Sequence, residues 1–466
     1  MSDRAALTAG YLAVTTRHGA TAGDLLATLP RGDMVGTGAG SRYLSRPLFL
    51  GHAETAQLHA DLRQLRAALI SLPDRLYGGD VAAFAAAAGL TGPQLAAVTQ
   101  SQPLPVTGLT RADMYAAEDG LRLLEFNMGS AVDGLESADI CRAMLRQPLL
   151  REFAREHGLS YPDTMAAELD LLRAETGIAS GACPMVAVVD WPDHFARIRP
   201  FLHTVTRRWR QRGLDAHACH LGQLTMSGGR VRLRGRPVDV IFRIFLAEHL
   251  LEPGGPELMN PVLNAVARGE VAMFTALDAE LYGSKAPLAM LSDRANRHLF
   301  TSAELAAIDR VLPWTRMLRP GPTILPDGTS ADLYDYALAH AHDLVLKPNL
   351  LHGSIGVVPG WQPGLTRRAW RDALAGAMGG PYVLQQRVRP VPEWCPGPDG
   401  ALVPWTAVWG VFSFPAGYGG VFARAVPADA PTAVTRTGTD LYIGCCLTGR
   451  PESGNTRPGA IGPEPK

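Results

Sequence analysis

The stretch Asp343-Leu-Val-Leu-Lys-Pro-Asn349, followed by Gly353-Ser-Ile-Gly356-Val-Val358, decides how the fold is interpreted. The apolar run Leu344–Leu346 predicts a buried strand that ends at Lys347, and Gly356–Val358 predicts the returning strand of a hairpin. A charge at the end of a buried strand is costly unless it is paired, which indicates an anionic partner. Glycines in the loop let backbone N–H groups approach such an anion. The alternative is a lysine whose ammonium group simply reaches the surface.

Lysine is rare in this chain. Of 44 basic residues, only Lys285, Lys347 and the last residue, Lys466, are lysines, and the others are arginines. An ammonium group is a compact point charge that fits between phosphate oxygens, whereas a guanidinium group presents a broad planar fork. The two internal lysines therefore indicate positions where an arginine could not replace the lysine. Lys285 stands at the start of a predicted helix, Ala286–Leu291.

Length and composition narrow the class of protein. A chain of 466 residues exceeds the roughly 250–300 residues beyond which cores usually divide, so we expect two or three domains. Its 44 basic and 44 acidic residues cancel, which argues against nucleic acid or an anionic membrane as a partner. No run approaches the roughly 18 apolar residues of a membrane span. Six cysteines without CxxC spacing favour reduced thiols in the cytoplasm.

A second feature is a predicted β-hairpin. Thr110–Tyr115 and Leu121–Asn127 have the pattern of strands, and Glu118-Asp-Gly120 between them is typical of a tight turn. Side chains two residues apart on a strand point to the same face, so Arg111 and Asp113 share a face of the first strand.

Glu125 and Asn127 share a face of the returning strand for the same reason. If the strands pair, Asp113, Glu125 and Asn127 converge beside the guanidinium group of Arg111. Three hard oxygen ligands suit Mg²⁺, which takes its remaining ligands from water and substrate phosphate. The alternative is an exposed hairpin decorated by an Arg–Asp ion pair and a capping asparagine.

The rest of the chain divides by its periodicity. Leucines at helical spacing within Ala53–Leu72 indicate that the first hundred residues are mainly helical. Further on, the buried strands Met185–Val189 and Val238–Arg243, with a helix over His194–Arg212 between them, predict a small parallel sheet. The Pro- and Gly-rich tail Arg450–Lys466 predicts disorder.

Common catalytic fingerprints are absent from the sequence. Neither internal lysine lies in a GxxxxGK[ST] motif, and GxSxG and HExxH do not occur. Gly36-Thr-Gly38 lacks the third glycine of a dinucleotide-binding loop. His217-Ala-Cys219-His220 lacks a second pair of metal ligands. Pro381–Val388 predicts a strand whose apolar half could pack on a purine, with Gln385 or Gln386 recognising its amino edge.

These stretches together resemble the circularly permuted ATP-grasp family, which includes glutathionylspermidine synthetases and similar peptide ligases. The main match runs from Asp343–Asn349 through Gly360-Trp361 and Trp370 to Tyr382-Val-Leu-Gln-Gln-Arg-Val388. Leu281-Tyr-Gly-Ser-Lys285 resembles the family's earlier nucleotide-binding lysine.

Two further matches precede the lysines. Arg111-x-Asp113 and Glu125-x-Asn127 resemble the family's metal site, and Asp239-Val-Ile-Phe-Arg243 resembles the arginine strand before its nucleotide domain. A metal site ahead of the lysines is the order of the permuted form.

The resemblance implies an α/β (α+β) class with a circularly permuted ATP-grasp fold and a small Rossmann-like pre-ATP-grasp unit. The expected divisions are a mainly helical region (1–105), the metal-binding part of the core (106–178), the pre-ATP-grasp unit (179–268), the ATP-binding subdomain with the remaining core (269–449), and the tail (450–466).

The resemblance also implies an activity, namely ATP-dependent joining of a small carboxylate and an amine through an acyl phosphate, with ATP and Mg²⁺. Arg111 would meet the charge that develops during catalysis. The implied binding residues are Lys285, Lys347, Gly353, Ser354, Gly356, Gln385 and Gln386 for ATP, Asp113, Glu125 and Asn127 for the metal, and Ser130, Arg243 and Arg424 for substrate.

The sequence departs from the family at two places. The glycine loop has Ser354 or Ile355 where relatives often carry a second lysine, and Val421–Cys446 lacks their NV-x-x-GG stretch, which forms a wall of the acceptor pocket. Two other functions stay open, an intramolecular cyclase on the same fold and a non-catalytic ATP-binding regulator. A homodimer is the default expectation for assembly.

Overall fold

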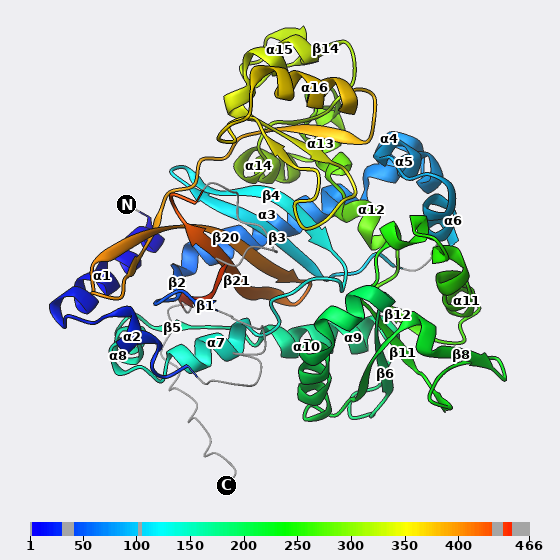
Figure 1. Ribbon diagram of the computed structural model, residues 1–466, viewed down its shortest axis with the longest axis horizontal. Helices are drawn as coiled ribbons and strands as arrows, with labels where there is room; N and C mark the ends of the chain where they lie inside the picture. The colour runs from blue at the N-terminus through cyan, green and yellow to red at the C-terminus, as the bar shows by residue number, and fades with distance from the viewer. Residues whose placement is uncertain (1, 30–41, 101–104, 431–440, 450–466) are drawn as a thin grey trace.

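The computed structural model describes residues 2–29, 42–100, 105–430 and 441–449. The described chain forms three sheet-based units (Figure 1). A large central sheet lies between a four-stranded parallel sheet and a smaller antiparallel sheet that carries the stretch 343–358. The motif at residues 36–38 and the tail 450–466 lie outside the described residues.

The central sheet has nine strands, with β1-β22-β21-β20-β3-β4 in order, while β19 pairs with β20 and β2 and β5 pair with β22. The predicted hairpin is confirmed as β3 and β4. The strands are β1 (Arg42–Tyr43), β2 (Leu48–Leu50), β3 (Thr110–Ala117), β4 (Gly120–Met128), β5 (Leu159–Ser160), β19 (Glu393–Pro396), β20 (Leu402–Phe414), β21 (Gly417–Pro427) and β22 (Tyr442–Gly449).

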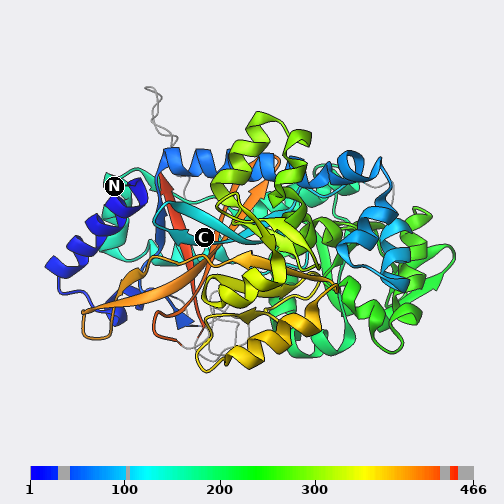
Figure 2. The same ribbon diagram turned by 90° about the horizontal axis from the view of Figure 1, so that it is seen from above.

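Helices cover both faces of this sheet, so β3 and the second half of β20 are buried (Figure 2). On one face lies α3 (His52–Ile70), whose leucines 58, 62, 65 and 69 are buried, so the predicted amphipathic helix is confirmed. On the other face lie α7 (Ser137–Met144) and α9 (Thr164–Thr176). The neighbouring helices are α1 (Asp3–Arg17), α2 (Ala22–Leu26), α4 (Leu72–Tyr77), α5 (Val81–Ala88), α6 (Gly92–Gln100) and α8 (Pro148–Glu156).

The mainly helical first hundred residues also supply two strands to the central sheet. β1 and β2 run parallel to β22, at the far end of the described chain. This region therefore shares a sheet with residues more than 390 positions away, counting from Leu50 to Tyr442. Short strands with no repeated pattern gave no signal for this pairing.

The predicted parallel sheet is confirmed and has four strands in the order β12-β11-β6-β7. It comprises β6 (Met185–Asp190), β7 (Asp215–His220), β11 (Val240–Arg243) and β12 (Ala272–Phe274), with α10 (Pro192–Arg210) and α11 (Gly255–Ala267). Because β12 belongs to this sheet, the sheet extends past residue 268, where a boundary was expected. A small antiparallel sheet is attached, made of β8 (Leu224–Ser227), β9 (Arg230–Leu233) and β10 (Arg236–Pro237).

The third sheet, β13-β18-β16-β17, contains the predicted hairpin of residues 344–358. Its buried face packs against α15 and α16 around Trp370, Leu346 and Leu384. The elements are β13 (Thr315–Met317), β16 (Leu344–Pro348), β17 (Val358–Pro359), β18 (Tyr382–Gln386), α15 (Leu333–Ala339) and α16 (Arg367–Ala377), with α12 (Ala279–Gly283), α13 (Lys285–Ser292), α14 (Ser302–Val311), β14 (Pro322–Ile324) and β15 (Ser330–Asp332) beside them.

Within the residues that the structure describes, no helix combines the length and apolar character that crossing a bilayer requires.

A buried acid in α9 gives this fold a pH-dependent stability. Glu168 is 1% exposed, and neither of its carboxyl oxygens has a hydrogen-bond partner. Burial raises the pKa of Glu168 from its ordinary 4.5 to about 8. Between these values the folded state holds a proton that the unfolded state releases, so stability falls by about 1.4 kcal/mol per pH unit as pH rises through this window.

We therefore expect Glu168→Gln to melt at nearly the same temperature as the parent protein near pH 5 and at a higher temperature near pH 8. Thermal unfolding at several pH values measures the difference, with Glu156→Gln, at an exposed position of α8, as control. A difference that does not change with pH would contradict burial as the cause.

Candidate active site

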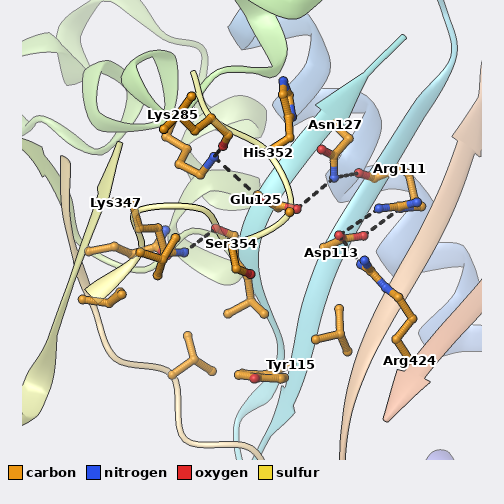
Figure 3. A pocket seen from close by; sticks show the side chains of 18 of the residues that line it. Arg111, Asp113, Tyr115, Glu125, Asn127, Lys285, Lys347, His352, Ser354 and Arg424 are labelled. Atoms are coloured by element: carbon orange, nitrogen blue, oxygen red, sulfur yellow. Dashed lines mark hydrogen bonds and ion pairs between the residues drawn. The ribbon is translucent and has the colours of Figure 1, made fainter. Parts of the chain in front are cut away.

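The largest group of predicted site residues lines one pocket, of about 170 Å³, between the central sheet and the sheet of Lys347 (Figure 3). Strands β3 and β4 form one wall, and β16, β18 and the glycine loop form another. The predicted residues in the lining are Arg111, Asp113, Glu125, Asn127, Lys285, Lys347, Gly353, Ser354, Gln385, Gln386 and Arg424. Gly356, Ser130 and Arg243 are not part of it.

A bulge in β4 shapes the floor of the pocket. Asp113 lies opposite Glu125, but the next residue, Met114, lies opposite Leu123, so Leu124 has no partner on β3. An unpaired residue of this kind bends the strand and frees its backbone groups from the ladder. The carbonyl oxygen of Leu124 accepts a hydrogen bond from Lys347 Nζ at 2.9 Å.

Lys347 is held by a second acceptor. Its Nζ donates to Gln385 Oε1 at 2.6 Å, and Gln385 Nε2 in turn donates to Thr315 Oγ1 at 3.2 Å. Burial lowers the pKa of Lys347 to about 8, while the charge of Glu125 opposes this shift and that of Lys285 adds to it. Gln385, expected at a purine edge, therefore orients the lysine here, and Gln386 beside it is exposed.

Lys285 begins α13 and reaches the same space from the other side. Its Nζ donates to the carbonyl oxygen of Leu351 at 3.1 Å and lies 3.7 Å from Glu125 Oε2. Burial alone would raise the pKa of Glu125, but the ammonium groups of Lys285 and Lys347 outweigh it and hold this pKa well below its usual range. Glu125 is therefore ionised between two cations.

Two arginines enclose the neighbouring carboxylate. Arg111 Nε and Nη2 donate to the two oxygens of Asp113 at 2.8 and 3.0 Å, and Arg424 forms an ion pair with Asp113 from β21. Arg111 also donates to the carbonyl oxygen of Asp133 at 2.9 Å and pairs with its carboxylate. The Nε of Arg424 is buried without a hydrogen-bond partner.

The predicted metal ligands have suitable donor atoms. Asn127 Nδ2 is 3.4 Å from both the Arg111 carbonyl oxygen and Glu125 Oε1, so the amide turns its nitrogen toward the protein and its oxygen is left for a cation. Glu125 is ionised, as a ligand must be. Asp113 would exchange an arginine contact for a metal bond. Within the described part of the chain, no group of three or more His, Cys, Asp or Glu side chains is arranged to hold a metal ion.

Ser130 and Arg243 are occupied by protein groups. Ser130 Oγ donates to the carbonyl oxygen of Arg243 at 2.6 Å. Arg243 is fully buried, donates to the carbonyl oxygens of Thr275 and Phe245 at 2.7 Å each, and pairs with Glu280. These contacts join the parallel sheet to the loop after β4 and present no donor to a substrate in the main pocket.

Sequence reasoning missed several lining residues. His352, in the loop after β16, and Asp133, after β4, both face the pocket. Asp133 lies outside the alternating pattern of the hairpin, and His352 stands just before the glycine loop without a spacing signal. Their positions depend on how the loops fold back on the sheet, which short-range patterns do not encode.

Comparison with known proteins identifies no matching family model and no matching curated sequence. Among solved structures, a glutathione synthetase-like effector from Globodera pallida aligns with 96% of this chain and 98% of its own, at 15% identity and a TM-score of 0.54. The fold is similar to that of ATP-grasp-type ligases. The mixed α/β prediction is confirmed, and circular permutation stays a prediction.

Two more distant structures complete the comparison. A putative gamma-glutamylcysteine synthetase from Methylobacillus flagellatus has 13% identity and a TM-score of 0.40 over 88% of this chain and 90% of its own. D-alanyl-alanine synthetase A from Vibrio cholerae has 12% identity and a TM-score of 0.25 over 50% of this chain and 68% of its own.

The contacts of Asp113 predict a large effect on stability. Asp113→Asn removes the charge that two buried guanidinium groups share, and uncompensated buried charge typically costs roughly 3–5 kcal/mol. We expect the midpoint of urea unfolding to fall accordingly. Glu152→Gln, which breaks an exposed ion pair with Arg155, should leave the midpoint unchanged. Equal midpoints for both variants would contradict the buried pairing.

Proposed function

We propose that this protein is an ATP-dependent carboxylate–amine ligase that forms an amide or peptide bond and releases ADP and phosphate. The observation that carries the proposal is the convergence of Lys285, Lys347 and the Asp113–Glu125–Asn127 set on one pocket. The whole-chain similarity to a glutathione synthetase-like effector supports the choice of amino acids and short peptides as first substrates to test.

The two lysines would bind the phosphates. Each ammonium group already has protein acceptors that fix its position, namely Leu124 O and Gln385 Oε1 for Lys347 and Leu351 O for Lys285. Phosphate oxygens would add to these contacts, and their charge would offset the cost of burying Lys347. Positions fixed in advance need little reorganisation when charge develops, which is the main source of electrostatic catalysis.

The opposite end of the pocket suits the carboxylate substrate. Arg111 and Arg424, which line this end, present guanidinium groups around Asp113. Magnesium, held by Glu125, Asn127 and Asp113, would neutralise phosphate charge and help stabilise the transferred phosphoryl group. Arg111 would then oppose the charge on the acyl phosphate.

Two other functions differ in what they require. An intramolecular cyclase would release ADP with a single substrate and no separate amine. A non-catalytic regulator would bind nucleotide without releasing ADP. The ionised Glu125 and the free Asn127 oxygen favour a catalytic protein, since both groups suit metal binding. An ADP-release screen over carboxylate–amine pairs, with each partner also tested alone, separates all three.

We expect Lys347→Arg to weaken ATP binding although the positive charge is kept. The planar fork cannot occupy the narrow site between Leu124 O and Gln385 Oε1, so at least one charged hydrogen bond is lost. Such a bond is worth roughly 1.5–3 kcal/mol, or about tenfold or more in Kd. Calorimetric titration with Mg-ATP measures it, and Lys466→Arg, at the last residue, is the control. Unchanged affinity would rule out the phosphate role.

Glu125→Gln should abolish Mg²⁺-dependent ADP release without unfolding the protein. Loss of one transition-state electrostatic contact costs about 10²–10³ in rate. Glu118→Gln changes an exposed carboxylate in the turn of the same hairpin and should have no effect. If Glu125→Gln lowers the rate of ADP release by less than about fivefold, the hairpin carboxylates do not take part in the reaction.

A further inference from the structure

His352 occupies a position that the roles assigned above leave unused. Its side chain lines the main pocket and also two small cavities that adjoin it, of about 20 Å³ and 10 Å³. Figure 3 shows its ring at the end of the pocket between Lys285 and Asn127, away from Arg424. The imidazole therefore borders the main pocket and both small cavities.

The two cavities limit what can approach the ring. A water molecule needs about 10–15 Å³ of such space, so each cavity holds one or two atoms of that size. An amine nitrogen is equally small, whereas a bulky group does not fit. The walls also carry carboxyl groups, Glu280 in both cavities, where it is paired with Arg243, and Glu248 in the smaller one, whose pKa burial raises to about 7. Glu248 Oε2 is buried and has no hydrogen-bond partner.

A ring nitrogen of this imidazole can accept a proton. No hydrogen bond to either ring nitrogen of His352 occurs among the described residues, whereas His194 and His217 are each bonded to an aspartate. Burial lowers the pKa of His352, so the ring is neutral near pH 7 and one nitrogen carries a free lone pair. The charged groups that act on it are Glu280 from α12, Glu125 from β4, Lys285 from α13 and Arg243 from β11.

We propose that His352 is the general base that deprotonates the amine substrate of the ligation. This rests on the proposed function, because it assigns a residue to its second step. An aliphatic amine is protonated at neutral pH and cannot attack a carbonyl carbon until it loses a proton. His352 offers a nitrogen acceptor on the side of the pocket opposite the arginines that suit the carboxylate.

The bound ammonium group transfers one proton to a ring nitrogen of His352 and becomes a neutral amine. Its lone pair forms the C–N bond with the acyl carbon, and the C–O bond to the phosphoryl group breaks. Phosphate departs with that electron pair and takes the second proton from nitrogen, while the amide keeps the third. No oxidant, reductant or further reactant is needed.

The test compares two nucleophiles on the full-length protein. Hydroxylamine is largely unprotonated at neutral pH and needs no base, whereas methylamine is protonated and does. Each is supplied with Mg-ATP and the proteinogenic amino acids in turn as carboxylate donors. Hydroxamate, N-methylamide and ADP are measured for the parent protein, His352→Gln and His352→Ala.

The expected result is selective. General bases typically contribute about 10²–10⁴ in rate, so both variants should lose at least about 100-fold in N-methylamide formation while hydroxamate formation changes less than about threefold. Added imidazole should restore part of the amide formation by His352→Ala. His59→Gln changes another partly buried histidine, bonded to Ser413 outside the pocket, and should resemble the parent protein.

Other outcomes overturn the assignment in distinguishable ways. If the variants lose both products equally, or neither, His352 is not the base although the ligase activity stands. If the parent protein forms neither product and releases no ADP with any donor, the ligase proposal itself fails and this one fails with it.

Discussion

The ammonium group of Lys347 is the point on which the arrangement of the site depends. It lies half-buried between two sheets, and an ammonium group withdrawn from water in this way is costly unless acceptors surround it. One acceptor is the carbonyl oxygen of Leu124, freed by the bulge in β4, and the other is Gln385 on β18. The first of these contacts connects residues 223 positions apart in the chain, and the second connects residues 38 apart. The bulge therefore couples the position of the central sheet to that of the sheet carrying the glycine loop.

Charged side chains of both signs line the pocket around this lysine. The main pocket is lined by four cations, Arg111, Lys285, Lys347 and Arg424, and by three carboxylates, Asp113, Glu125 and Asp133. Ion pairs between these groups reduce the cost of placing so many charges together. Because there are four cations and three carboxylates, one positive charge remains unbalanced. A multiply charged anion with a divalent cation fits this balance better than either ion alone. The net charge of the whole chain is zero, so composition alone does not reveal this local excess of positive charge.

The sequence predicted the parts of the site that follow from local periodicity. Alternation within β3 and β4 placed Asp113 near Glu125, and the apolar run before Lys347 predicted its strand, because side chains two apart share a face. The bulge at Leu124 was not predicted, although the apolar alternation shifts by one residue there, from Leu121 and Leu123 to Phe126 and Met128.

Residue positions that depend on contacts between distant elements could not be predicted from the sequence either. The pairing of β1 and β2 with β22 depends on strands of two and three residues, which are too short to show the alternation of apolar and polar residues typical of a strand. His352 is placed by the fold of its loop, and Ser130 and Arg243 by a network that joins two units. A motif gives the residue type at such a position but not the atoms that its side chain meets.

Arg243 illustrates how such a residue acts at a distance. It was expected at the substrate, yet its guanidinium group pairs with Glu280 on α12, and Glu280 also accepts the backbone N–H of Ala247 at 2.9 Å. Helix α12 ends at Gly283, and Lys285 begins the next helix two residues later. A Cβ atom at Gly283 would lie 2.9 Å from the Met128 nitrogen, so α12 packs directly on β4. The buried arginine thus anchors the helix that sets both the start of α13 and the acidic wall beside His352.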